Sequence, residues 1–143
     1  MKKIILFLIL IPTFVFAQNS ENTREKIKQL KIAFITTELN LNSDESAKFW
    51  PIYNAAENKI FDIKKTRYQA YNKYIKDKKE SEITEADAKK FIEIMDDCEK
   101  KIFDIKADLN QNLGNSITYK KIVKLKKAEE DFRQKLLEQY KRQ

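Results

Sequence analysis

The stretch Glu57–Lys64, ENKIFDIK, decides the fold, because the chain repeats it 42 residues later as EKKIFDIK at Glu99–Lys106. The six letters KIFDIK are identical in the two copies. Four further positions agree at the same shift, namely Lys48 with Lys90, Phe49 with Phe91, Ile52 with Ile94 and Glu57 with Glu99. A shift of 42 equals six heptads, so both segments keep one phase for helix packing. The repeat therefore predicts two long helices built on one template.

Turn residues are too scarce for a sheet. After residue 17 the chain has one glycine, Gly114, and one proline, Pro51. Hairpins and sheets of several strands need many more such residues. The sequence therefore predicts an all-α fold, in which a few long helices are joined by short turns.

Apolar spacing places four helices. They are expected over about Asn22 or Thr23 to Leu39, Ser43 to Lys76, Thr84 to about Leu109, and about Thr118 to near the end. The second helix has a stripe with steps of three and four, as in a heptad seam: Phe49, Tyr53, Ala56, Ile60, Ile63, Arg67, Ala70 and Tyr74. The third repeats this pattern with Ala88, Phe91, Met95, Cys98, Ile102, Ile105 and Leu109. These two helices are expected to pack as a long antiparallel hairpin.

The outer helices have shorter stripes. The first has Ile27, Leu30, Phe34, Ile35 and Leu39, and the last has Ile122, Leu125, Phe132, Leu136 and Tyr140. Capping residues indicate the boundaries: Ser43, Thr84 and Thr118 are expected N-caps. Asn110–Ser116, NQNLGNS, is expected to be a joint between helices. Pro51 is expected either to kink the second helix or to start it afresh.

The first 17 residues are typical of a cleaved export signal. Lys2 and Lys3 precede an apolar run from Ile4 to Phe16, and Ala17 is the small residue needed before a cleavage site. Cleavage near Ala17 would leave an exported, single helical domain over 18–143. Losing two of the 29 basic residues and none of the 22 acidic ones leaves a net charge of +5. In an exported protein, this charge favours acidic protein or envelope surfaces over nucleic acid as counterparts.

The chain has no histidine and a single cysteine, Cys98. Histidine is the commonest general base and metal ligand, so its absence excludes Ser-His-Asp and Cys-His sites and His-containing metal sites. The chain is therefore expected not to be an enzyme and to need no cofactor or metal. Cys98 lies on the stripe of the third helix and is expected to be a buried, inert thiol. Asp62 and Asp104 of the two repeats are expected to face water rather than form a catalytic pair.

Two groups of residues are candidates for binding. The first is the aromatic cluster of Phe49, Trp50 and Tyr53 beside Pro51. Core packing is its preferred interpretation, because aromatic residues at helical spacing usually face a core. The alternative is an apolar patch that contacts a partner.

The second group is a basic and aromatic run without acidic residues, from Lys64 to Lys76. Its proposed contact residues are Lys64, Lys65, Arg67, Tyr68 and Tyr71. Tyrosine and arginine bind through amphipathic area and fork-like donors, whereas lysine stems on a solvated face also cover apolar neighbours. Both interpretations stay open. The lysines of residues 120–127 are interpreted as a solvated face.

These features together carry a family resemblance. The export signal, the short first helix, Leu41–Glu45 (LNSDE), the long hairpin and the last helix resemble the Spy/CpxP family of periplasmic proteins, whose mark is the LTxxQ motif. Leu30–Asn54 and Lys121–Leu137 are similar to the small exported members found in Bacteroidetes. The match departs from the motif at Asn42 and Glu45, and a second motif is present only as Ile117–Lys121, ITYKK.

The resemblance implies a thin, curved, all-helical cradle, usually dimeric, that binds non-native proteins without ATP on a basic concave face with apolar patches. The other function that it allows is an envelope-stress sensor, linked to ECF-type sigma factors, that binds one membrane-bound signalling partner. The leading hypothesis is an ATP-independent, chaperone-like protein that binds unfolded or partly folded envelope proteins, with a homodimer as an option. The stress sensor is the alternative hypothesis.

Overall fold

The computed structural model describes residues 15–141, with side chains described from Asn22 to Lys141. It consists of α1 (Val15–Leu39), α2 (Ser43–Tyr74), α3 (Glu85–Gly114) and α4 (Tyr119–Lys141), with a short 3₁₀ helix, η1 (Glu80–Glu82), between α2 and α3. Residues 15–141 contain no strand. The predicted all-α fold of four helices is thereby confirmed. Most of the predicted export signal lies outside the described residues.

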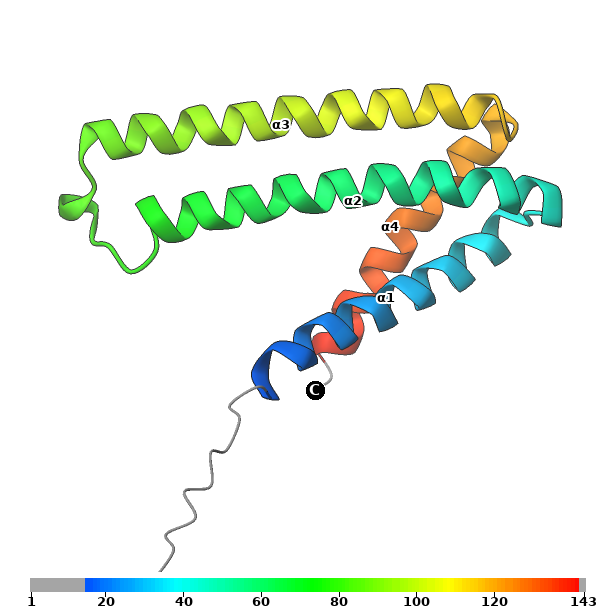
Figure 1. Ribbon diagram of the computed structural model, residues 1–143, viewed down its shortest axis with the longest axis horizontal. Helices are drawn as coiled ribbons and strands as arrows, with labels where there is room; N and C mark the ends of the chain where they lie inside the picture. Colours follow the sequence, from blue (N-terminus) through cyan, green and yellow to red (C-terminus); the bar gives the residue numbers. More distant parts are fainter. Residues whose placement is uncertain (1–14, 142–143) are drawn as a thin grey trace, which may run out of the picture.

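The helices form two arms that meet at one end (Figure 1). One arm is the predicted antiparallel hairpin, in which α2 and α3 pack along their lengths. The other arm is α1 packed against α4, and it diverges from the hairpin at an angle. We call the end where all four helices meet the joint, and the opposite end of the hairpin the tip. The α1–α4 arm leaves the tip uncovered.

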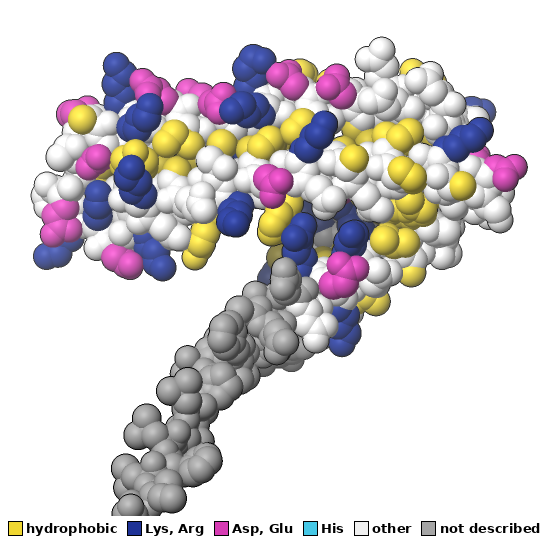
Figure 2. Space-filling view, viewed as in Figure 1, with side chains coloured by type: hydrophobic (Ala, Val, Ile, Leu, Met, Phe, Trp, Pro, Cys, Tyr) yellow, Lys and Arg dark blue, Asp and Glu magenta, His cyan; other side chains and the backbone are white. Residues whose placement is uncertain are grey.

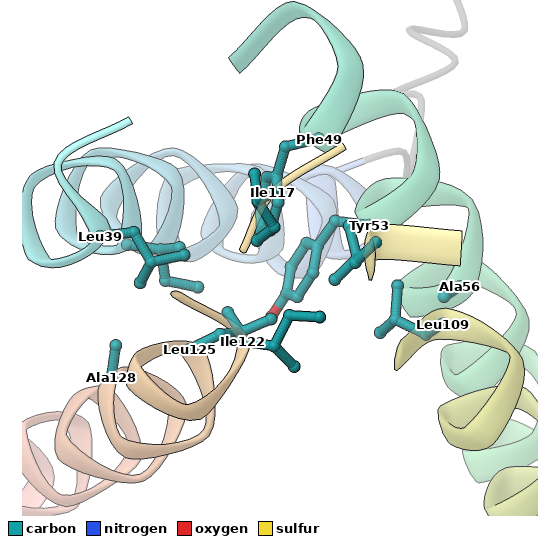
Figure 3. Close-up of a cluster of buried hydrophobic side chains, with 11 residues drawn as sticks. Leu39, Phe49, Tyr53, Ala56, Leu109, Ile117, Ile122, Leu125 and Ala128 are labelled. Carbon is teal, nitrogen blue, oxygen red and sulfur yellow. The ribbon is translucent and has the colours of Figure 1, made fainter. Parts of the chain in front are cut away.

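The main hydrophobic core lies at the joint and draws on every helix. Its buried members are Ile35, Leu39, Phe49, Tyr53, Ala56, Leu109, Leu113, Ile117, Ile122, Leu125 and Ala128. In Figure 3, Tyr53 extends from α2 toward Ile122 and Leu125 of α4. Burial of side chains this large contributes about 1.5–3 kcal/mol each. The joint is therefore the region where burial stabilises the fold most.

The hairpin follows the predicted seams. None of the predicted seam residues of α2 or α3 is exposed, and Ile60, Ala70 and Cys98 are buried beyond the main core. Arg67, the one charged residue of the α2 seam, is half-buried and lies 4.0 Å from a carboxylate oxygen of Glu99 on α3. The prediction that Cys98 is a buried thiol is confirmed, since its exposure is 2%.

The repeated hexapeptide forms two matching ribs of the hairpin. In the first copy Ile60 is buried and Ile63 half-buried, while in the second copy Ile102 and Ile105 are half-buried. Asp62 and Asp104 are exposed, as expected. The phenylalanines of the two copies are also exposed: Phe61 by 40% and Phe103 by 72%. The repeat thus supplies both a packing face and two exposed aromatic rings.

The start of α2 differs from expectation. Its N-cap is Asn42 rather than Ser43: the Asn42 side chain accepts a hydrogen bond from the Glu45 amide at 2.9 Å, and the Glu45 carboxylate accepts one from the Asn42 amide at 3.1 Å. This reciprocal pair is a capping box. Lys121 of α4 ion-pairs with the same carboxylate, and this contact is the main reason why the pKa of Glu45 lies below its usual value. Glu45 therefore links the start of α2 to α4.

Other boundaries were predicted with mixed success. α2 runs without interruption through the exposed Pro51, so a fresh start at this residue is wrong. α3 continues to Gly114, so the segment that connects it to α4 is shorter than the predicted Asn110–Ser116. α1 begins before Asn22 but ends at Leu39, as expected. Thr84 caps α3, and the Thr118 hydroxyl accepts from the Lys121 amide at 3.4 Å.

The stripes of the outer helices hold only in part. Leu30 is 51% exposed and Tyr140 is 59% exposed, so neither belongs to the core. Leu30 lies two residues from the half-buried Ile32, and residues two apart on a helix point in nearly opposite directions. Ile27 and Leu136 are half-buried, and Phe132 is buried.

Candidate functional site

A cleft of about 590 Å³ lies between the two arms and is lined by residues of all four helices. Its apolar lining consists of Ile27, Ile32, Trp50, Tyr53, Ile60, Phe61, Phe132 and Leu136. Its charged lining consists of seven basic residues, Arg24, Lys28, Lys31, Lys64, Lys106, Lys126 and Arg133, and three acidic residues, Glu57, Glu129 and Glu130. In Figure 2, basic side chains gather in the angle between the hairpin and the α1–α4 arm. The cleft is thus apolar in part and carries an excess of positive charge.

An aromatic cluster forms the cleft wall nearest the joint. The rings of Phe49 and Tyr53 stack with centroids 5.2 Å apart, and Trp50 meets both edge-on, at 4.8 and 5.6 Å. Phe49 and Tyr53 are buried, whereas Trp50 is half-buried and lines the cleft. The Tyr53 hydroxyl donates a 2.8 Å hydrogen bond to Glu129 of α4. Burial, followed by the negative charges of Glu129 and Glu57, raises the pKa of Tyr53 far above its usual value.

Contacts between α1 and α2 close one side of the cleft. Lys31 ion-pairs with Glu57 at 2.6 Å, and its ammonium lies 5.2 Å from the centre of the Tyr53 ring. The Arg24 guanidinium lies 3.6 Å above the Phe61 ring, within cation–π range. The first copy of the repeated hexapeptide therefore supplies a wall of the cleft through Phe61.

All three acidic residues of the lining already have partners. Glu57 is paired with Lys31, and Glu129 accepts from Tyr53. Glu130 accepts from Arg133 at 2.6 and 3.0 Å and from Gln134 at 2.8 Å, contacts that hold the pKa of Glu130 below its usual value. These carboxylates are therefore engaged within the protein.

Four lysines of the lining have no acceptor among the described residues. They are Lys28 of α1, Lys64 of α2, Lys106 of α3 and Lys126 of α4. Lys28 is half-buried, and the other three are exposed. Each helix thus contributes one unpaired ammonium group, and these groups, together with the Arg24 guanidinium, outweigh the charge of Glu129, the one carboxylate of the lining without a cationic partner.

The cleft wall continues along the hairpin toward the tip. Steps of three and four residues along α2 lead from Phe61 and Lys64 to Tyr68 and Tyr71, so these side chains share one side of the helix. Tyr68 is 61% exposed and Tyr71 is 46% exposed. On α3, steps of three, four and seven residues lead back from Lys106 through Phe103 and Glu99 to Ile92, and Phe103 and Ile92 are exposed. We call this side of the hairpin the cleft face.

Charges are paired in a different way on the rest of α3. Lys101 pairs with Asp97 at 2.7 Å and Lys100 with Asp104 at 2.8 Å, both within the helix. Such exposed pairs along one helix are typical of a solvated surface. In Figure 2, basic and acidic side chains are interspersed along the hairpin. The hairpin is therefore two-sided, with its exposed aromatic rings on the cleft face.

The predicted binding residues fall into three groups. Phe49 and Tyr53 are buried in the core, so the preferred interpretation of core packing is confirmed for both, and Tyr53 also forms part of the cleft lining. Trp50 and Lys64 line the cleft, while Tyr68 and Tyr71 are exposed on the cleft face. Lys65 is exposed, and Arg67 is half-buried in the seam, where it faces Glu99.

The prediction missed several residues of the cleft lining. These are Arg24, Lys28, Phe61, Lys106 and Lys126. Phe61 could have been identified, because Trp50, Glu57, Phe61, Lys64 and Tyr68 are spaced by seven, four, three and four residues and so form a second stripe beside the seam. The lysines of α1, α3 and α4 carried no such signal, since their meeting depends on how the arms pack.

The described residues contain no group of three or more histidine, cysteine, aspartate or glutamate side chains placed to hold a metal ion. Among the same residues, no helix combines the length and apolar character needed to cross a bilayer.

Comparison of the chain with models of known families, with curated proteins and with solved structures finds no match. The resemblance to the Spy/CpxP family therefore rests on the residues quoted above.

Proposed function

We propose that this is an exported, ATP-independent, chaperone-like protein that binds unfolded or partly folded polypeptides on the cleft and the cleft face. The observation that carries the proposal is the combination of unpaired lysines with exposed aromatic rings on one continuous side of the hairpin. Exposed apolar groups of this kind mark binding surfaces in many proteins. Tyrosine suits such a role, because it offers a large contact area with a polar tip.

A surface that offers both charged and apolar contacts suits weak binding to many different polypeptides. Exposed ion pairs contribute only about 0–1 kcal/mol each. A client would thus be attracted by charge and held by several small contacts, and it could leave to fold. Export is part of this proposal, and the charged and apolar pattern of residues 1–17 supports it.

Light scattering tests this function. Equimolar protein is expected to slow the aggregation of several unrelated denatured proteins, in a buffer without ATP. Replacing Tyr68 and Tyr71 with serine removes two exposed rings of the cleft face and is expected to weaken the effect. The matched control is Val123→Ser on α4, a residue that is 71% exposed and does not line the cleft.

Two results would count against general client binding. One is unchanged aggregation of all substrates in the presence of the wild-type protein. The other is capture of one membrane protein from envelope extracts, with no effect on denatured proteins, which would favour the stress-sensor hypothesis.

A further inference from the structure

We infer that the cleft between the arms selects acidic amphipathic segments, in which several carboxylates alternate with apolar side chains. The inference rests on the proposed function and specifies the class of polypeptide that this site takes. It applies to the cleft itself, whereas general client binding also uses the exposed tyrosines of the cleft face nearer the tip.

The first support is the state of the charges in the cleft. Glu57 and Glu130 are ion-paired with Lys31 and Arg133, and Glu129 accepts a hydrogen bond from the neutral Tyr53 hydroxyl. Lys28, Lys64, Lys106 and Lys126 are not matched by any described residue. An incoming carboxylate would therefore find free ammonium donors. The electrostatic complement of this cleft is an anion.

The half-buried Lys28 strengthens this point. Its ammonium lacks an acceptor among the described residues, although part of the side chain is removed from water. Lysine stems pack against apolar surface while the ammonium stays in water. The half-buried Lys28 therefore holds its charged group at the cleft wall, where an incoming carboxylate can reach it.

The distribution of the lysines indicates a ligand with several negative charges. One lysine of the lining comes from each helix, so the four ammonium groups are supplied by four different elements. A single-headed amphiphile, such as a fatty acid, needs one cationic spot beside an apolar pocket. A polypeptide with spaced carboxylates matches cationic groups on separate walls, and we therefore favour it.

The apolar lining adds the second requirement. Trp50, Phe61 and Phe132 lie among the lysines, on α2 and α4. Phe132 is already buried, whereas Trp50 and Phe61 keep surface in water. Apolar side chains between the carboxylates would cover that surface, at about 25 cal/mol per Å² of apolar area removed from water.

The single tryptophan of the chain reports on occupancy, because Trp50 lines the cleft. The protein without its predicted export signal, residues 18–143, is titrated with a peptide of alternating glutamate and leucine residues. A second titration uses the same peptide with glutamine in place of glutamate. The acidic peptide is expected to shift Trp50 emission to shorter wavelength and to bind more weakly as salt rises. The glutamine peptide is expected to bind at least roughly tenfold more weakly, through loss of several ion pairs.

Two pairs of substitutions locate the binding. Lys28→Gln with Lys126→Gln, and separately Lys64→Gln with Lys106→Gln, are each expected to weaken the acidic peptide roughly five- to tenfold. The control is Lys100→Gln with Lys101→Gln, which removes the same charge from ion pairs of α3 outside the cleft. This control is expected to bind as the wild type does.

The inference is overturned if both peptides bind equally, if the control weakens binding as much as the cleft pairs do, or if dodecanoate or oligothymidylate shifts Trp50 at lower concentration than the acidic peptide. Failure here is distinct from failure of the proposed function. If the protein slows aggregation but binds both peptides equally, the proposed function stands and the inference about the cleft is wrong. If it binds the acidic peptide selectively but never slows aggregation, the cleft selects acidic segments and the chaperone-like function is wrong.

Discussion

The Tyr53 hydroxyl of α2 donates to Oε1 of Glu129 of α4 across 2.8 Å, and this hydrogen bond joins the two arms at the inner end of the cleft. Tyr53 is 1% exposed, and its ring belongs to the main core. Glu129 lines the cleft, where it is half-buried. One side chain therefore takes part in both the core and the candidate site, and its polar tip fixes how α4 meets α2.

Replacing Tyr53 with phenylalanine should reduce the free energy of unfolding by about 1.5–3 kcal/mol, because a charged, half-buried acceptor loses its donor. Urea unfolding followed by circular dichroism measures this change. Tyr140→Phe is the control, since Tyr140 is exposed and should tolerate the loss of its hydroxyl. Equal effects of the two substitutions would show that the Tyr53 hydrogen bond does not stabilise the joint.

Stability should fall at alkaline pH through Tyr53. Burial raises the folded-state pKa of Tyr53 far above the value of about 10 that it has in the unfolded chain. Above that pH the unfolded chain releases this proton and the folded chain keeps it. The contribution of Tyr53 to the free energy of unfolding is therefore fully present below about pH 10 and is lost as pH rises further. The free energy of unfolding, measured with urea at pH 9, 10 and 11, should fall faster for the wild type than for Tyr53→Phe, by up to about 1.4 kcal/mol per pH unit. Parallel curves for the two proteins would contradict this assignment.

Asn42→Ala should destabilise the protein by about 1 kcal/mol, because it removes the side chain that caps α2. Ser43→Ala is the matched control: the sequence pointed to Ser43 as the cap, whereas the structure assigns this role to Asn42. Thermal unfolding distinguishes the two residues. A larger loss for Ser43→Ala would mean that α2 starts one residue later than the structure shows.

The Cys98 thiol should react with a thiol reagent such as iodoacetamide only when the hairpin opens, since it is 2% exposed between α2 and α3. The expected labelling rate is far below that of the protein in urea. Glu99→Ala, which removes the partner of Arg67 next to this site, should speed labelling modestly. Immediate labelling of the native protein would show that the seam is open at Cys98.

The hairpin could be predicted from the sequence because the buried side of each helix is set by the spacing of apolar residues within that helix. Steps of three and four residues from Phe49 to Tyr74 specify one buried side of α2, whatever the helix packs against. The repeat of KIFDIK then matched α3 to the same phase. Helix ends were less certain, because Asn42 and Ser43 are both good caps and only the position of Glu45 selects Asn42.

The candidate site was harder to predict, because it depends on contacts between arms. Nothing in the spacing of Lys28, Lys106 or Lys126 indicates that these residues meet around one cleft. The aromatic cluster of Phe49, Trp50 and Tyr53 is equally hard to interpret from sequence: Phe49 lies in the core alone, Tyr53 lies in the core and lines the cleft, and Trp50 is half-buried in the cleft wall. The angle between the two arms sets this difference.

The position of the core at the joint implies a gradient of local stability along the hairpin. Beyond Ala56 and Leu109, the main core ends and α2 is held to α3 by the seam alone. Backbone amides near the tip should therefore exchange with solvent through fraying of the last turns, whereas those near Phe49 and Leu113 should exchange only when the whole fold opens. The hairpin is thus anchored at the joint, and its tip can unwind and re-form while the end at the joint stays folded.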